Sequence, residues 1–312
     1  MLGLLGLVGL ILINGSDFAA LGMVLLTPPL ALLISLITHV PQLMFGAQAW
    51  LVLLPREHRP SFRRMLRLRW YREAADSLLP AGAVMGQAAV TRLMIRDGVP
   101  TDVAASTGTI GIALESASQL LLTMLGLAML LSINSEAQIS GFLIAMALAC
   151  LTIAGLFAVQ RPPALRLLRR ILERLARRWP RLDPAWIDQF QVAMLRLHAD
   201  RRGLAVSVLL HFGSWMMGAI EMALLLWLIG YPVSFAEALV IESFAQVLRN
   251  AGFLLPGSAG VQEGAILAGG LLVGVPLATA ANAALVRRTR EILVGVTGLI
   301  AWRRDETRAA HP

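Results

Sequence analysis

Charged side chains lie inside long apolar stretches of the sequence, where they are costly to leave without a partner. In the second half of the chain these candidates for polar chemistry are Glu242, Arg249, Glu263, Arg290 and Glu291. A charged side chain in membrane hydrocarbon costs about 2.5 kcal/mol or more, so each one needs a partner or a role. A network of carboxylates and guanidiniums can exchange one member for a phosphate or another polar headgroup. The pattern therefore predicts a polar substrate-binding path, with purely structural ion pairs as the alternative.

The segment 256–263 reads Pro-Gly-Ser-Ala-Gly-Val-Gln-Glu, the composition of a chain break followed by a helix start. Gly257 exposes backbone N–H groups there, and it joins the substrate-binding candidates. Glu263 falls in the first turn of the helix, where the helix dipole favours a carboxylate. It is therefore either a helix cap or a group that binds substrate or a proton. In the first half of the chain, Arg72 and Glu115 are the corresponding candidates for substrate binding.

Residues for other chemistry are sparse. The histidines have no partner at metal-ligand spacing, and Cys150, the only cysteine, lies in an apolar run. The sequence contains no Gly-x-Ser-x-Gly elbow and no Gly-x-x-x-x-Gly-Lys loop. We expect no metal ion and no cofactor, and we expect that the protein is not an enzyme. A membrane-embedded enzyme is a third hypothesis that no nucleophile supports.

The composition of the whole chain is that of a membrane protein. Of the 312 residues, 57% are hydrophobic and 15% are charged, and the mean hydropathy is +0.71. Soluble domains have about 45–50% apolar and about 25% charged residues. Because each crossing takes about 20 apolar residues, little length remains for a soluble catalytic domain. The predicted fold class is an all-α integral membrane protein, a polytopic helical bundle.

Arginines form three blocks, within 56–72, 161–202 and 303–308, and the formal net charge is +8. By the positive-inside rule these blocks face the cytoplasm. They adjoin apolar segments and carry no nucleic-acid motif, so anionic lipid headgroups are the expected counter-ions and nucleic acid is not an expected partner. Within 165–179, leucines at helical spacing alternate with arginines, which predicts an amphipathic helix in the headgroup region. A solvated charged connector is the alternative.

An internal repeat accounts for the two stretches that the simple spans leave unplaced. Leu78-Leu79-Pro80 and Gly98-Val99-Pro100 recur at the same spacing as Leu254-Leu255-Pro256 and Gly274-Val275-Pro276, and Glu115 then falls on Glu291. The flanking spans require 73–100 to begin and end on the cytoplasmic side and 234–276 to begin and end outside. Each copy is therefore predicted to be a re-entrant helical hairpin. Two such units of opposite orientation are the inverted-topology repeats of a secondary transporter, whose substrate site lies near the midplane.

These considerations divide the chain into four parts. Residues 1–27 hold an N-terminal span and an outer turn. Residues 28–132 form the first repeat, with its cytoplasmic-side hairpin at 73–100. Residues 133–203 form a linking span and the arginine-rich cytoplasmic amphipathic loop, and residues 204–308 form the second repeat, with its outer-side hairpin at 234–276.

Several motifs, spread over nearly the whole chain, resemble one family of membrane proteins. They are Arg-Trp-Tyr-Arg-Glu at 69–73, Leu-Leu-Pro at 78–80, Ala-Leu-Val-Ile-Glu-Ser at 238–243, Leu-Pro-Gly at 255–257, Gly-Val-Gln-Glu-Gly at 260–264 and Arg-Thr-Arg-Glu at 288–291. On these residues the chain resembles the flippase-like family that includes the transmembrane region of lysylphosphatidylglycerol synthases, and most closely its hopanoid-biosynthesis-associated HpnL branch. The resemblance implies a lipid translocase or lipid-trafficking factor for hopanoid or other isoprenoid lipids.

The leading hypothesis is a lipid flippase-like transporter in the bacterial inner (cytoplasmic) membrane, with a polar path for the headgroup while the tail stays in lipid. The alternative is a non-transporting accessory or scaffold subunit for membrane lipid-modifying enzymes. The expected partners are membrane lipids, either isoprenoid or anionic phospholipid, with lipid-biosynthesis enzymes as further candidates. The lipid, the direction, the coupling ion and the oligomeric state stay open at this point.

Overall fold

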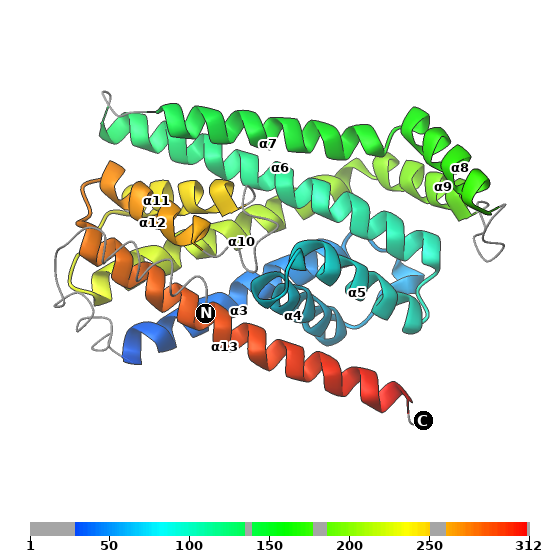
Figure 1. The fold of residues 1–312 in the computed structure, drawn as a ribbon, viewed down its shortest axis with the longest axis horizontal. Helices are drawn as coiled ribbons and strands as arrows, with labels where there is room; N and C mark the ends of the chain where they lie inside the picture. Colours follow the sequence, from blue (N-terminus) through cyan, green and yellow to red (C-terminus); the bar gives the residue numbers. More distant parts are fainter. Residues whose placement is uncertain (1–28, 135–138, 177–185, 250–259, 311–312) are drawn as a thin grey trace.

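The computed structural model describes residues 29–134, 139–176, 186–249 and 260–310. All regular secondary structure in these residues is helical, in agreement with the predicted all-α class (Figure 1). The predicted N-terminal span within 1–27, and Gly257, lie outside the described residues.

Three of the described helices are long and apolar enough to cross a membrane, by length and composition. They are α3 (Pro29–Leu51), α6 (Thr101–Ile133) and α10 (Arg201–Leu228). Helix α10 packs along both α3 and α6. It approaches α3 closely at Gly213, where an added Cβ would lie 3.3 Å from the Phe45 ring. These helices agree with the predicted integral membrane protein.

Two pairs of short helices pack against each other in the regions of the two predicted hairpins, but the first pair begins at Phe62, eleven residues before the predicted start at residue 73. The first helix pair is α4 (Phe62–Leu78) with α5 (Gly82–Arg96), and the second is α11 (Phe235–Arg249) with α12 (Val261–Leu272). Pro80 lies in the turn of the first pair, beside Ala81, which has a left-handed backbone with φ of 49°. The depth of the pairs in a bilayer, their re-entrant character and their inverted relationship remain predictions.

Glycine brings the backbones of the first helix pair into contact. An added Cβ at Gly82 would lie 2.0 Å from the Ala75 carbonyl oxygen, and one at Gly86 would lie 2.7 Å from the Arg72 carbonyl oxygen. No side chain fits at such distances, so α5 can lie this close to α4 only because both positions lack a Cβ. This close approach determines how α4, which carries Arg72, is oriented against α5.

The remaining elements enclose this arrangement. They are η1 (Arg56–His58), α7 (Ser140–Val159), α8 (Pro162–Ala176), α9 (Trp186–Ala199) and α13 (Leu277–Ala310). In Figure 1, α7 to α9 lie on one side of the bundle and α13 lies on the other. Helix α9 buries Ile187, Phe190 and Met194 against α6, and Arg169 of α8 lies 2.8 Å from Asp188 of α9.

Ion pairs hold the C-terminal end of α13 to the first helix pair. Arg64 of α4 lies 2.6 Å from Asp97 at the end of α5 and 2.6 Å from Asp305 of α13. Arg96 lies 3.1 Å from the same Asp305 carboxylate. Partial burial opposes ionisation of Asp305, but Arg64 and Arg96 outweigh it and hold the pKa of this carboxyl below its ordinary value.

Candidate functional site

A polar cavity of about 200 Å³, here called the central cavity, lies where both helix pairs meet the long helices. Side chains of α3, α4, α5, α6, α10, α11, α12 and α13 line it. Its charged residues are Arg69, Arg72, Glu73, Asp76, Glu115, Arg249, Arg287, Arg290 and Glu291. The cavity therefore gathers charges from both halves of the chain.

One wall of the central cavity is built on Glu115 of α6. Its carboxylate lies 2.6 Å from Arg69 Nη2 and 2.8 Å from Arg72 Nη1. The two arginines project from one face of α4 because they are three residues apart. The Trp50 ring of α3 lies 6.0 Å from the Arg69 guanidinium and 5.4 Å from that of Arg72, a cation–π arrangement. Two cations thus share one carboxylate and one aromatic ring, which leaves a net positive wall.

A second wall is a chain of polar contacts from α4 through α3 to α13. Arg290 Nη1 donates to His39 Nδ1 at 2.5 Å, and His39 Nε2 lies 2.8 Å from Glu73 Oε1. His39 therefore lies between the Arg290 guanidinium on one side and the Glu73 carboxylate on the other. Arg290 also lies 3.3 Å from Glu221 of α10. This chain links α3, α4, α10 and α13 through side chains alone.

The pair formed by Glu242 of α11 and Arg287 of α13 is almost completely buried, and Arg287 also lies 3.8 Å from the equally buried Glu221 of α10. The two side chains lie 2.6 Å apart and are 0% and 2% exposed. Gly218 of α10 makes room for the carboxylate, since an added Cβ there would lie 2.4 Å from Glu242 Oε1. Glu242 also accepts a hydrogen bond from Gln246 at 2.7 Å. Glu242 is thus fully engaged in packing and does not line the central cavity.

Asp76 and Arg249 form the ion pair that joins the two helix pairs. Arg249 Nη2 of α11 donates to Asp76 Oδ2 of α4 at 2.6 Å. Their side chains are 22% and 34% exposed for Arg249 and Asp76, the highest values among the described ion pairs that line the central cavity. This pair is therefore the one that a ligand can reach with the least desolvation and repacking.

The remaining predicted residues lie on α12 and α13. Glu263 accepts a hydrogen bond from the Gly260 backbone N–H at 2.7 Å, which caps α12, and it lies 3.5 Å from Arg288. It does not line the central cavity. Glu291 does, and it accepts a hydrogen bond from Gln262 at 2.9 Å. Of the predicted set, the structure brings Arg72, Glu115, Arg249, Arg290 and Glu291 to the cavity.

Sequence reasoning missed His39, Glu221 and the pairing of Glu242. Glu221 is the only acidic residue between 204 and 229, so the cost of a charge in an apolar helix is a signal that could have identified it. His39 carried no such signal, because a neutral imidazole is compatible with an apolar helix. The structure pairs Glu242 with Arg287, one turn before Arg290 on the same face of α13.

Comparison with known proteins identifies the family. A family model described as the lysylphosphatidylglycerol synthase transmembrane region matches residues 1–298, nearly the whole chain. The chain therefore belongs to this family, and it is a membrane protein with a lipid-related function. No curated protein and no solved structure matches the chain.

Proposed function

We propose that the protein is a lipid flippase-like transporter and not an enzyme. The observation that carries the proposal is the Asp76–Arg249 pair, which is exposed to the central cavity at the junction of the two helix pairs. A polar headgroup that enters the cavity takes the place of Asp76 on Arg249, or of Arg249 on Asp76, while the lipid tail stays outside among the helices. Exchange of one charged partner for another lowers the desolvation cost of moving a headgroup through the membrane.

The other cavity residues suit a headgroup with several polar atoms. Gln42, Ser214 and Gln262 line the same space and offer neutral donors and acceptors. Arg69 and Arg72, which share Glu115, add positive charge to the same cavity. This mixture supports a polyol or a phosphate headgroup. The motifs in the sequence favour hopanoid or another isoprenoid lipid as the substrate and the bacterial inner membrane, with the arginine-rich loops cytoplasmic, as the location.

Lipid movement in proteoliposomes tests this function. The purified chain is reconstituted with fluorescent hopanoid, polyprenyl-phosphate or phospholipid probes, and transbilayer movement is followed by dithionite quenching. The proposal expects movement of one probe class, and loss of that movement in the Asp76→Asn/Arg249→Gln double variant. No movement of any probe by folded wild-type protein would contradict a transporter.

A second candidate function, a scaffold for lipid-modifying enzymes, is favoured by α8. This helix exposes Leu167 and Ile171 together with arginines, and it packs at one end of the bundle against α9. Neutralisation of Arg169 and Arg170 tests it. Loss of co-purifying lipid-biosynthesis enzymes, with lipid movement absent in the wild-type protein, would favour the scaffold over the transporter.

A further inference from the structure

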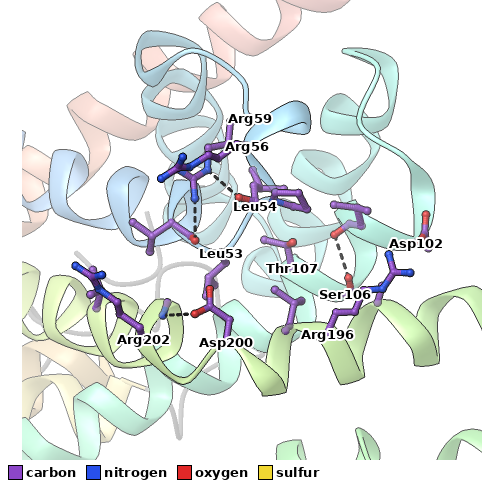
Figure 2. A pocket seen from close by; sticks show the side chains of 17 residues that line it. Leu53, Leu54, Arg56, Arg59, Asp102, Ser106, Thr107, Arg196, Asp200 and Arg202 are labelled. Atoms are coloured by element: carbon purple, nitrogen blue, oxygen red, sulfur yellow. Dashed lines mark hydrogen bonds between the residues drawn. The ribbon is translucent and has the colours of Figure 1, made fainter.

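A second cavity, of about 580 Å³, shares no lining residue with the central cavity. It lies between the C-terminal end of α3, the N-terminal ends of α6 and α10, and α9 (Figure 2). We call it the arginine pocket because Arg56, Arg59, Arg196 and Arg202 line it, against the two aspartates Asp102 and Asp200. All four arginines come from the blocks that the sequence assigns to the cytoplasmic side.

Two of these charged groups are already engaged in the fold. Arg59 donates to the carbonyl oxygens of Leu54 at 2.7 Å and Val52 at 3.2 Å, just beyond the end of α3. Asp200 accepts from the Gly203 backbone N–H at 2.9 Å and so caps α10. Arg56, Arg196 and Arg202 have no side-chain hydrogen bond or ion pair within the described part of the chain. Three exposed arginines that line one cavity therefore have uncommitted guanidinium donors.

The pocket also holds a buried hydroxyl without a partner. Thr107 of α6 is 1% exposed, and its Oγ1 has no hydrogen-bond partner among the described residues. Buried polar groups are normally satisfied, so a hydroxyl that lines a cavity in this state is available to a ligand. The labelled Thr107 side chain lies on the pocket wall formed by α6 in Figure 2.

The N-terminus of α6 adds to the positive potential, whereas that of α10 is already capped by Asp200. Asp102 and Val103 belong to the first turn of α6, and Arg202 and Gly203 belong to the first turn of α10. The N-terminus of α6 has no side-chain cap, because its N-cap residue is Pro100. Uncapped N–H groups and the dipole of a long helix favour an anion at this end.

Most of the remaining lining is apolar and includes Leu53, Val103, Leu197 and Val206. A small inorganic anion would leave this surface uncovered, whereas the first carbons of an acyl or isoprenoid chain would cover it. The pocket thus combines a cationic part with an apolar part in one cavity.

We propose that the arginine pocket binds the phosphate group of an amphiphile, with Arg56, Arg196 and Arg202 as charged donors and Thr107 as a neutral donor. Guanidiniums bind phosphate oxygens through paired N–H groups, which suits a phosphate monoester or diester. The pocket is a binding site separate from the central cavity, and it is independent of the transport proposed above.

Isothermal titration of the full chain in dodecyl maltoside tests the site. The probes are dihexanoyl phosphatidic acid, as a lipid phosphate, and inorganic phosphate, as the free anion. In the triple variant Arg56→Gln/Arg196→Gln/Arg202→Gln we expect affinity for the phosphatidic acid to fall by at least about tenfold, because three charge-assisted contacts are lost. Thr107→Val, which removes only the hydroxyl, should weaken binding by a smaller factor.

The matched control is Arg63→Gln/Arg303→Gln/Arg304→Gln, which removes the same charge from exposed positions outside the pocket. It should retain the wild-type affinity. If inorganic phosphate also binds and loses affinity in the triple variant, the ligand is free phosphate. If only dihexanoyl phosphatidic acid binds, the ligand is a lipid headgroup. Equal affinity in the triple variant and its control would overturn the proposal, and so would binding that is lost only in Arg249→Gln, which places the phosphate in the central cavity.

A measurement on the wild-type protein covers the case in which the triple variant does not fold. Phenylglyoxal modifies accessible arginines, and mass spectrometry reads each site. Dihexanoyl phosphatidic acid should protect Arg56, Arg196 and Arg202 from modification and leave Arg63, Arg303 and Arg304 unprotected. Uniform protection, or none, would contradict the site.

Discussion

Arg249 of α11 donates to Asp76 of α4 across 2.6 Å, so an ion pair joins the second helix pair to the first. Both residues face the central cavity. A ligand that enters the cavity can reach this ion pair. If the ligand replaces one of the two partners, the contact between the two helix pairs is lost. The proposed lipid transport depends on this pair.

Arg287 is predicted to be essential for stability. Arg287→Met leaves Glu242, which is 0% exposed, without its partner at 2.6 Å. Removal of one partner from a buried ion pair costs about 3–5 kcal/mol, whereas replacement of both by apolar residues of similar size is often nearly neutral. Thermal unfolding in detergent should therefore show a large loss for Arg287→Met and a partial recovery for Arg287→Met/Glu242→Leu. Equal melting temperatures for the two variants would contradict this role.

Gly82 is predicted to be required for the first helix pair. In Gly82→Ala the new Cβ would meet the Ala75 carbonyl oxygen at 2.0 Å, so α4 and α5 must separate, at a cost of about 1–3 kcal/mol. Gly264→Ala is the matched control in α12, because nothing lies within 4 Å of its added Cβ. There, alanine should preserve or slightly raise stability through its higher helix propensity. A Gly82→Ala protein as stable as Gly264→Ala would show that the close approach is not needed.

The helix pairs and the charged residues of the site were largely predictable, and their pairing was not. Hydropathy and the repeated proline marks locate α5 and the segment of α11–α12, but they miss the start of α4 at Phe62, which lies in an arginine-rich stretch. The cost of charges in apolar stretches identifies Arg72, Glu115, Arg249 and Glu291. The partner of Glu242 was not predictable, because Arg287 and Arg290 lie three residues apart on one face of α13 and differ only in height along the helix.

His39 shows a second limit of the sequence. Its contacts with Glu73 and Arg290 join residues far apart in the chain, and only the packing of α3 against α4 and α13 brings them together. For Glu263, the sequence left two roles open, a helix cap or a group that binds substrate or a proton. The hydrogen bond from the Gly260 backbone N–H shows the cap. The sequence identifies charged side chains in apolar stretches that need a partner, whereas the tertiary packing determines which partner each one has.

Asp305 is predicted to make stability depend on pH. Arg64 and Arg96 hold the pKa of its carboxyl below the ordinary value of 3.8. A lowered folded-state pKa stabilises the fold above the unfolded-state value, and this stabilisation is lost as the pH falls through the folded-state value. The difference in melting temperature between wild type and Asp305→Asn should therefore be constant near neutral pH and shrink below about pH 4. A difference that grows on acidification would contradict the ion-pair assignment.

The central claim is that Arg249 takes part in moving a lipid headgroup through the central cavity. The most direct test is the initial rate of transbilayer movement, for the probe that the wild-type protein moves, in proteoliposomes of Arg249→Gln and of the exposed control Arg303→Gln. Loss of one charge-assisted contact of about 1.5–3 kcal/mol predicts a rate at least about tenfold lower for Arg249→Gln and an unchanged rate for Arg303→Gln. Wild-type rates in both variants, from equally folded protein, would contradict the claim.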